Sequence, residues 1–335
     1  MATLSDVAAR AGVSISAVSR VLSDSPDSRV TPATRKRIES AARELDYHPN
    51  FTARALKRSR TQVVALVVPD LTNAIFAELM RGVEETANEL GYMVLLARAE
   101  SMRPAGTAIA RLVGEGRVDG VLLQLGDGAS LDELEPVLTQ NAPLVLVNSR
   151  RDGFVGSVTL PDAAASRMAV EHLVSLGHTA IAHIGGLPST DSAERRAEGF
   201  SAALLAAGLP QHPAFVTRLG YEPRQGREAL RRLVALPDPP SAVVVANINA
   251  ALGVLAEARS LGIRVPEELS VVAIHDAWTA ENAWPPLTTI NMPLYDLGRL
   301  SVTALVERIS AGVSADSVVS ELALGLVVRE STSRR

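Results

Sequence analysis

Side chains that could bind a polyanion are concentrated near the start of the chain. The stretch TLSDVAARAGVSISAVSR, residues 3–20, contains two short helical patterns separated by Gly12. In the second pattern the apolar positions Val18, Val21 and Leu22 share one side. The residues that this spacing leaves outward are Ile15, Ser16, Ser19 and Arg20. Because an outward arginine can make paired hydrogen bonds to a guanine edge, this face could read duplex DNA.

Groups that could perform catalysis are few. The chain has no cysteine, which excludes disulfides, thiolate nucleophiles and thiolate metal sites. His275 and Asp276 form the only suggestive acid–base pair, but adjacent side chains at a strand end point in different directions. The stretches IGGL and VGEG match no phosphate-binding loop. We therefore expect no catalytic residues, no metal site, no cofactor and no enzymatic activity.

The sequence pattern contains no targeting or membrane segment. No run of about 18 apolar residues is present. The first residues, which include Asp6 and Arg10, do not form a signal peptide. A chain without cysteine also suits a reducing compartment. We expect a cytoplasmic protein with no membrane partner.

Charge is distributed unevenly along the chain. Residues 1–60 contain 11 Lys and Arg against 6 Asp and Glu, a net charge of +5. The whole chain has a net charge of −4, so the remaining 275 residues carry −9. A basic head on an acidic body favours a polyanion partner for the head alone, although a solvated helical surface would show the same charge.

Residues 1–48 carry the signals of three helices. Thr3 followed by Asp6 predicts a capped start for the first helix, and Gly12 predicts the turn after it. Thr31 followed by Pro32 predicts the start of the third. Three short helices with a glycine turn between the first two indicate an all-α helix-turn-helix headpiece. Other small helical bundles share this pattern, and the basic charge with the exposed Arg20 favours DNA.

Residues 49–60 read as a linker. Pro49 ends the third helix, and Asn50 can cap a helix from Phe51 to about Arg58. A helix this short is unstable alone in water, so it would order only against a partner. Leu56 then has two interpretations: an apolar contact with the body, or a wedge in a DNA minor groove.

From residue 62 onward, apolar runs alternate with amphipathic helical patterns. The predicted strands are Val63–Val68, Tyr92–Ala97, Gly120–Leu123, Leu144–Asn148, Ala180–Ile184, Phe215–Leu219, Ala242–Ala246 and Ser270–Ile274. The predicted helices between them include Ala74–Leu90, Ala163–Leu176, Ala193–Ala207 and Ala250–Leu261. Apolar strands separated by helices indicate parallel sheets covered on both faces. We predict an α/β body of two doubly wound parallel-sheet lobes, with a ligand cleft at the strand ends.

Motifs along the whole chain resemble the LacI/GalR family of transcriptional regulators, the family of the lac and purine repressors. In the head they are LSDVAARAGVSISAVSRVL, VTPATRKRIESAARELDYHPN and ARALKR. In the body they are NAIFAELMRGVEETANELGY, HLVSLGHTAIAHIGG, RRAEGFSAAL, GIRVPEELSVVAIHD and PPLTTI. The resemblance implies a homodimer, a pseudo-palindromic double-stranded operator, and a periplasmic-binding-protein-like body with a small-molecule effector in its cleft.

The resemblance also implies a domain organisation. Residues 1–48 are expected to form the DNA-binding domain, 49–60 the hinge helix, and 61–335 the effector-binding and dimerisation domain. The chain would cross between lobes near Leu160, Thr289 and Val319. One lobe would then contain 62–160 and 290–319, and the other 161–288 and 320–335.

Family motifs assign DNA-contact roles to specific residues. The positions matching base readers are Ile15, Ser16 and Arg20, and those suited to phosphates are Thr3, Ser14, Ser19, Thr34 and Arg35. Isoleucine can read only thymine methyls or groove shape. The hinge positions matching minor-groove contacts are Arg54, Leu56 and Lys57.

The same resemblance implies an effector site formed by Phe76, Arg196, Tyr221, Asn247 and His275. The alternative for Phe76 is plain core packing. His275 stands where relatives usually have aspartate, and a histidine can donate a hydrogen bond or carry charge near neutral pH. Together with Arg196 it would favour an anionic effector such as a sugar acid over a neutral sugar. The alternative is that His275 bonds Asp276 or backbone and never meets the ligand.

The expected mechanism is allosteric repression. An effector bound between the lobes favours one lobe arrangement, which sets the separation of the two hinges in the dimer and so the operator affinity. The effector could release DNA or promote its binding. A transport binding protein would share the body but would need a signal sequence and no basic head.

Overall fold

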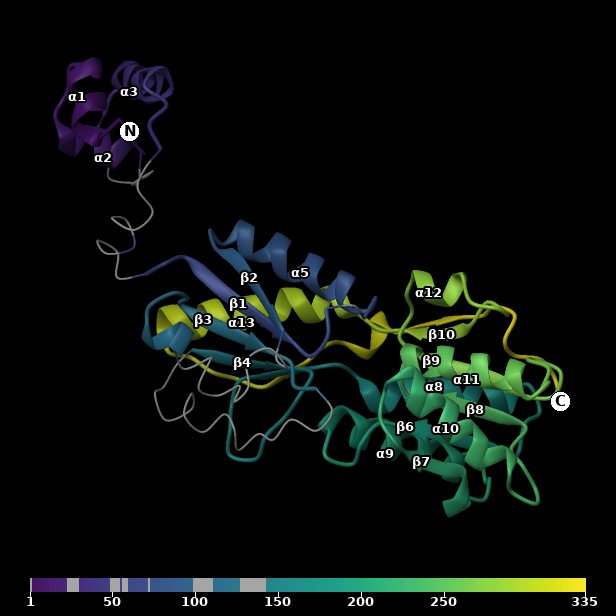
Figure 1. Cartoon of the computed structure of the whole chain (residues 1–335). Coiled ribbons are helices and arrows are strands. Elements are labelled where there is room, and N and C mark those ends of the chain that lie inside the picture. Colours follow the sequence, from purple (N-terminus) through teal and green to yellow (C-terminus); the bar gives the residue numbers. More distant parts are fainter. Residues whose placement is uncertain are drawn as a thin grey trace. The chain divides into compact units, whose positions relative to one another are not determined.

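The computed structural model describes residues 2–22, 30–48, 55, 60–71, 73–98, 111–126 and 143–335. The chain divides into two compact units, Met1–Thr61 and Gln62–Arg335 (Figure 1). The first is the headpiece and the second is the body. Most of the expected hinge, including Arg54, Leu56 and Lys57, lies outside the described residues.

The headpiece contains α1 (Leu4–Ala11), α2 (Ile15–Leu22) and α3 (Pro32–Glu44). The predicted caps are confirmed. Thr3 and Asp6 form a reciprocal capping box at the start of α1, and Gly12 ends this helix in the left-handed conformation at φ 65°. Thr31 caps α3 ahead of its first-turn proline. These local signals fix where each helix starts, so the turn between α1 and α2 is the one that the sequence predicts.

A small apolar core joins the three head helices. Val7 of α1, Val18 of α2 and Ile38 of α3 are fully buried. Their alanine and valine neighbours complete the same cluster, and Leu4, Leu22, Leu45 and Tyr47 pack at its edge. Because the core occupies one side of α2, the other side of that helix remains at the surface.

The first sheet of the body has the strand order β11-β5-β4-β3-β1-β2, and all its pairings are parallel. Its strands are β1 (Val63–Val68), β2 (Met93–Arg98), β3 (Gly120–Leu123), β4 (Leu144–Val147), β5 (Ser157–Thr159) and β11 (Ser317–Val318). The central strands β3 and β4 are buried at every position, as apolar runs covered on both faces require. The edge strand β2 is largely exposed.

The second sheet has the order β12-β10-β9-β8-β6-β7. Its strands are β6 (Ile181–Gly185), β7 (Val216–Arg218), β8 (Ala242–Val245), β9 (Ser270–Ile274), β10 (Thr288–Asn291) and β12 (Gly325–Val327). Only the edge pair β10–β12 is antiparallel. Two parallel-sheet lobes are therefore present, and the predicted fold class is confirmed.

Helices cover both sheets. On the first sheet α5 (Phe76–Glu89) packs against α13 (Leu294–Ala311), as Figure 1 shows. A side chain at Gly82 would overlap the Tyr295 backbone, so glycine permits this close approach. Around the second sheet α8 (Asp162–Ser175) packs on α9 (Asp191–Ala206), and α10 (Pro223–Val234) packs on α11 (Ile248–Ser260).

Every strand predicted from the sequence is present, with bounds within one residue of the prediction. The strands not predicted are β5, β10, β11 and β12, which are at most four residues long; β5, β10 and β11 also contain polar side chains. Apolar runs this short carry no periodic signal. In the described part of the chain no helix is long and apolar enough to cross a membrane.

Candidate functional site

The outward face of α2 presents the predicted base-reading side chains. Ile15 is 49% exposed, and Ser16 and Arg20 are also exposed, while Val18 on the opposite side is fully buried. The face combines one apolar, one hydroxyl and one guanidinium group. A helix of this kind can enter a major groove and contact a thymine methyl, a base edge and a guanine.

The predicted phosphate-contacting residues cluster at helix starts. Thr3 is the N-cap of α1, Ser14 bonds the Ala17 backbone N–H at the start of α2, and Thr34 lies in the first turn of α3. Backbone N–H groups that lack helical partners gather at such positions and attract anions. Arg35 follows Thr34 and is half-buried, as is Ser19 in the middle of α2. The arrangement suits phosphate binding at the three helix starts.

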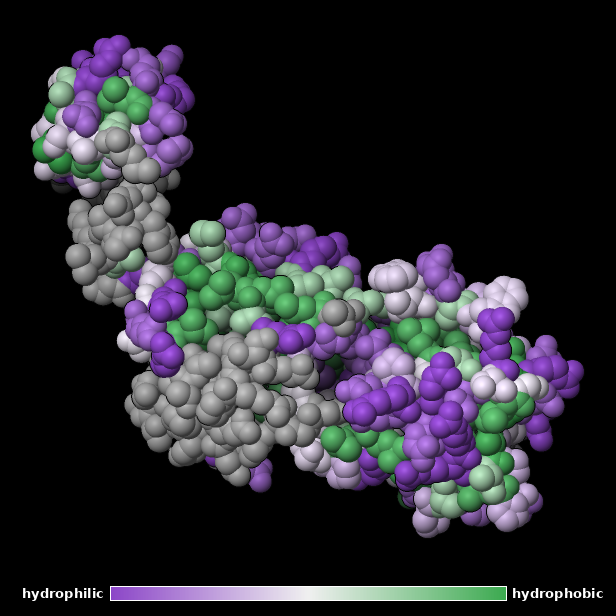
Figure 2. All heavy atoms as spheres, in the orientation of Figure 1, coloured by the Kyte–Doolittle hydropathy of each residue, from purple (hydrophilic) through white to green (hydrophobic). Residues whose placement is uncertain are grey.

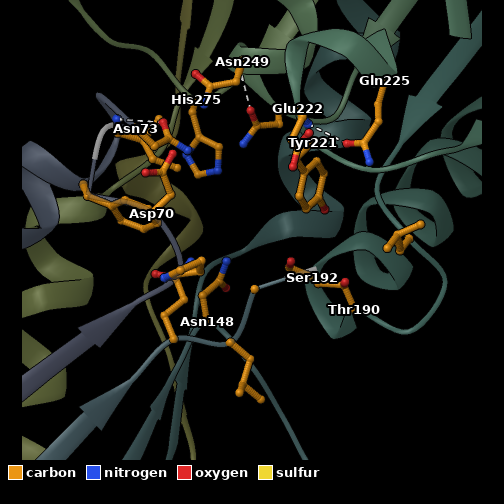
Figure 3. Close-up of a pocket in the computed structure, with 18 of the residues that line it drawn as sticks. Asp70, Asn73, Asn148, Thr190, Ser192, Tyr221, Glu222, Gln225, Asn249 and His275 are labelled. Carbon is orange, nitrogen blue, oxygen red and sulfur yellow. Dashed lines mark hydrogen bonds between the residues drawn. The ribbon is translucent and has the colours of Figure 1, made fainter. Parts of the chain in front are cut away.

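The body contains a cavity of about 580 Å³ bounded by strand ends of both sheets (Figure 3). From the first sheet come residues that follow β1, β3 and β4: Asp70, Gln124 and Asn148. From the second come residues that follow β7, β8 and β9: Tyr221, Asn247 and His275. Polar groups at the carboxyl ends of parallel strands form the usual ligand position of doubly wound folds.

All five residues assigned to effector binding line this cavity: Phe76, Arg196, Tyr221, Asn247 and His275. Phe76 is 4% exposed and also packs in the main core. Its position therefore fits both the effector-site interpretation and the core interpretation. The Asn247 side-chain oxygen caps α11 through the Asn249 N–H at 2.7 Å, which turns its amide N–H groups elsewhere. The binding roles of the five residues stay predictions.

Arg196 is a buried, fully organised side chain. It is 2% exposed, and its Nε donates to Asp162 Oδ1 at 2.7 Å. One terminal nitrogen donates to the Ala246 carbonyl and the other lies 2.8 Å from His275 Nε2. Asp162, whose side chain is fully buried, neutralises its charge. Arg196 therefore holds neighbouring groups of the cavity wall in place, and its paired charge leaves little net positive charge for a ligand.

The environment of His275 disfavours its charged form, which removes support for one of the two roles that its side chain could have. Its side chain is 3% exposed. Burial first, and then the positive charge of Arg196, lower the pKa of His275 well below its usual value. With His275 neutral and Arg196 paired, the electrostatic reason for an anionic effector is lost.

Asp276 points away from the cavity, so His275 does not bond it. Both carboxylate oxygens of Asp276 accept from the guanidinium of Arg329, at 2.8 and 3.0 Å, and Thr289 donates to one of them at 2.8 Å. Thr289 belongs to β10, and Arg329 follows β12. The adjacent pair therefore faces two directions: His275 to the cavity, and Asp276 to the C-terminal segment.

The sequence analysis missed Asn148, which lines the cavity, and Asp162, which is buried behind the lining residue Arg196. Asp162, the first residue of α8, accepts from Arg195 and Arg196 at 2.7 Å each. Asn148 accepts from Arg195 at 2.9 Å and from the Leu160 backbone at 3.0 Å, which links β4 to the segment between the lobes. Asn148 could have been found, because a polar residue directly after a buried parallel strand lies at the ligand edge. Asp162 gave no such signal.

A helix-turn-helix with an outward polar face, together with a two-lobed body containing a polar cavity, defines a ligand-binding DNA-recognition protein. Two family models match the chain: bacterial regulatory proteins of the lacI family over residues 3–50, and a periplasmic binding protein-like domain over residues 170–332. The HTH-type transcriptional repressor CytR of Escherichia coli strain K12 is 33% identical over 336 residues, covering 99% of this chain and 96% of CytR.

Solved structures agree. A complex of the transcriptional regulator CelR with cellobiose is 32% identical, with a TM-score of 0.73 over 99% of this chain and 100% of that one. The lac repressor dimer bound to operator and the anti-inducer ONPF is 28% identical, with a TM-score of 0.82 over 99% of each chain. This chain belongs to the LacI family of transcriptional regulators, and it is a DNA-binding protein.

Proposed function

We propose that this protein is a repressor whose affinity for a pseudo-palindromic operator is set by a small effector bound in the body cavity. The observation that carries the proposal is the cavity itself. Its wall is built from strand ends of both lobes, so a ligand that contacts both favours one lobe arrangement over another. Cytoplasmic DNA is the expected partner, and no turnover of the effector is expected.

On the DNA side, Arg20 is assigned guanine recognition, and Ile15 with Ser16 the neighbouring positions. The support is their shared exposed face on α2. Thr3, Ser14, Ser19, Thr34 and Arg35 are assigned the phosphates that fix the register of the head. Arg54, Leu56 and Lys57 keep the minor-groove role that the family motif implies.

On the effector side, a neutral polyhydroxylated ligand is favoured over a sugar acid. The polar groups of the cavity are mainly amides and hydroxyls, such as Asn73, Gln124, Ser192 and Asn249. Phe76 and Tyr221 supply aromatic surface on which the apolar face of a sugar ring can pack. CelR was solved with a neutral sugar, cellobiose. The buried Asp162–Arg196 pair leaves little net positive charge for an anion.

A homodimer is the proposed assembly. The edge strand β2 exposes Met93, Leu95 and Leu96, and Figure 2 shows apolar surface in this region of the body. An exposed apolar sheet edge is a costly feature for a monomer. A second copy of the chain would cover it. The lac repressor relative was solved as a dimer on operator.

The test begins by selecting a binding sequence from a random DNA library with the full-length protein. Operator affinity is then measured at increasing salt, with and without D-ribose, D-glucose, D-galactose and cellobiose at millimolar concentration. The proposal predicts a symmetric selected site, affinity that falls steeply with salt, and a change in operator affinity with at least one sugar. Selection of no symmetric site, or no response to any sugar that binds, would contradict it.

A further inference from the structure

The imidazole of His275 has one nitrogen in contact and one without a partner. Its Nε2 lies 2.8 Å from the Arg196 Nη2. Its Nδ1 is buried and has no hydrogen-bond partner in the described part of the chain. The residue follows β9 and has φ 72°, a left-handed conformation that is uncommon outside glycine and asparagine. The fold thus keeps His275 in an unusual backbone conformation beside the cavity.

The contact with Arg196 decides which nitrogen of His275 carries the proton. A guanidinium only donates hydrogen bonds and does not lose its proton in proteins. The Nε2 atom must therefore accept, and it can do so only without a proton. A neutral imidazole carries its single proton on the other nitrogen. His275 is therefore fixed as the tautomer with a proton on Nδ1.

Asp162 holds this arrangement in place. The carboxylate accepts from Arg196 Nε at 2.7 Å, and the Ala246 carbonyl accepts from a further Arg196 nitrogen. Arg196 cannot rotate away from His275 without leaving a buried carboxylate unpaired. The proton on Nδ1 is thus set by three groups: the guanidinium of Arg196, which lines the cavity, and behind it the Asp162 carboxylate and the Ala246 carbonyl, which do not.

We propose that the Nδ1–H of His275 is the specificity-determining donor of the cavity, and that it selects effectors presenting a hydrogen-bond acceptor at that point. The inference rests on the proposed effector role of the cavity and deepens it. A buried N–H without an acceptor is costly, so an effector that supplies an oxygen lone pair gains more than one that supplies only a donor or a methylene group.

Asp70 is a cavity-lining carboxylate that could also accept a hydrogen bond from His275. Figure 3 shows Asp70 and Asn73 on the side of the cavity that faces His275, on the segment that follows β1. If lobe movement brought the Asp70 carboxylate onto the Nδ1–H, that hydrogen bond would join the lobes and compete with the effector. Asp70→Asn separates the two possible acceptors. If the effector accepts the hydrogen bond from Nδ1–H, the substitution should leave effector affinity unchanged or reduce it. If Asp70 accepts that hydrogen bond in competition with the effector, the substitution should raise effector affinity.

Two substitutions separate the hydrogen-bonding roles of the two His275 nitrogens. The amide nitrogen of asparagine is the same number of bonds from Cα as the Nδ1 atom of histidine. His275→Asn therefore keeps the donor to the effector and loses the acceptor for Arg196. Glutamine reaches the Nε2 position, so His275→Gln keeps the acceptor for Arg196 and loses the donor to the effector. Asparagine also tolerates the left-handed backbone. Thermal unfolding of each full-length variant reports whether it folds.

The probe is the sugar among D-ribose, D-glucose, D-galactose and cellobiose that binds the wild-type protein most tightly by calorimetry. We expect His275→Asn to bind it within about threefold of wild type, and His275→Gln to bind it at least about tenfold more weakly. Equal binding by His275→Gln, or the reverse order of the two variants, overturns the inference.

A series of sugar analogues makes the test independent of variant folding. Each hydroxyl of the probe is replaced in turn by hydrogen and by fluorine, which can accept but not donate. At the position that His275 reads, the deoxy analogue should bind wild-type protein about tenfold more weakly, and the fluoro analogue should recover part of that loss. No position with this pattern overturns the inference. If no sugar of the panel binds or shifts operator affinity, the proposed function itself fails.

Discussion

The outward face of α2 and the wall of the body cavity contain arginines in opposite environments. Arg20 is exposed on a helix whose other side forms a small core. Arg196 is 2% exposed and bonds a carboxylate, a carbonyl and an imidazole. An exposed guanidinium can exchange water for a base edge, whereas a buried one with fixed partners cannot change them cheaply. The comparison teaches that the head presents its recognition groups directly, while the body uses its arginine to orient other groups.

The largest effect is expected where the buried network loses its carboxylate. Asp162→Asn leaves the buried guanidinium of Arg196 without its counter-ion, while the partly buried Arg195 keeps Asp191, and it should lower the free energy of unfolding by about 3–5 kcal/mol. The control is Asp296→Asn, whose partner Arg299 lies 3.5 Å away on the surface, with an expected loss below about 1 kcal/mol. Urea unfolding measures both. Equal losses in the two variants would remove the distinction between buried and exposed arginines.

A second buried histidine gives the body a pH dependence that the head should lack. His183 is fully buried and stacks on Phe200, with both ring nitrogens unpartnered in the described part of the chain. Burial first, then the charges of Arg218 and Arg196, lower the pKa of His183 from 6.5 to about 3. Because the unfolded chain takes up this proton first, the stabilising contribution is complete above pH 6.5 and is lost as the pH falls from 6.5 toward 3.

Between pH 6.5 and about 4.5 this residue alone should lower the free energy of unfolding by about 2–3 kcal/mol. His183→Leu should remove that share of the slope in urea unfolding followed by circular dichroism. His212→Leu is the matched control, since His212 also contacts a phenylalanine, Phe215, but is exposed. An unchanged slope in His183→Leu would show that the buried ring is not the source.

In the headpiece we expect a smaller effect, on operator affinity, that depends on the DNA sequence. Arg20→Ala should weaken binding to the selected operator by about 1–3 kcal/mol and relax the preference at one base pair. Arg10→Ala removes the same charge from α1, where Arg10 pairs with Glu44, and should weaken binding without changing base preference. Fluorescence anisotropy on operators that vary one base pair at a time separates the two. A uniform loss in Arg20→Ala would reassign that residue to phosphate.

The smallest effect concerns packing beside the cavity. A methyl group at Gly186 would overlap the ring of Tyr221, so Gly186→Ala should displace the tyrosine and weaken sugar binding about tenfold. Gly325→Ala adds the same methyl group at a position with 3.9 Å of clearance and should leave sugar affinity unchanged. Calorimetry with both full-length variants measures the difference. Equal affinity would mean that Tyr221 does not contact the sugar.

The fold and most of the cavity were predictable because both follow from local pattern. Long apolar runs such as Val63–Val68 predict buried parallel strands, and residues after those strands, such as Tyr221 and His275, then gather at one edge. Outward positions on α2 follow from helical spacing alone. In each case a signal spanning a few residues determines where a side chain points.

The buried partners were not predictable, because they depend on contacts between distant segments. Asp162 at the start of α8 reads as an ordinary acidic residue in a first helical turn, and only the fold brings Arg195 and Arg196 of α9 onto it. Burial first, and then the charge of Arg196, lower the pKa of His275, and both depend on the same long-range contacts. The hypothesis of an anionic effector therefore loses its electrostatic support for a reason that the sequence does not contain.

Reciprocal titration tests the central claim most directly: operator affinity with and without the sugar that binds best, and sugar affinity with and without operator, on the full-length protein. Linkage requires the two ratios to be equal. We expect each affinity to change by the same factor, about 5- to 150-fold. The account would be contradicted if a sugar bound the cavity tightly but did not change the operator affinity and, in the reverse titration, did not have its own affinity changed by operator.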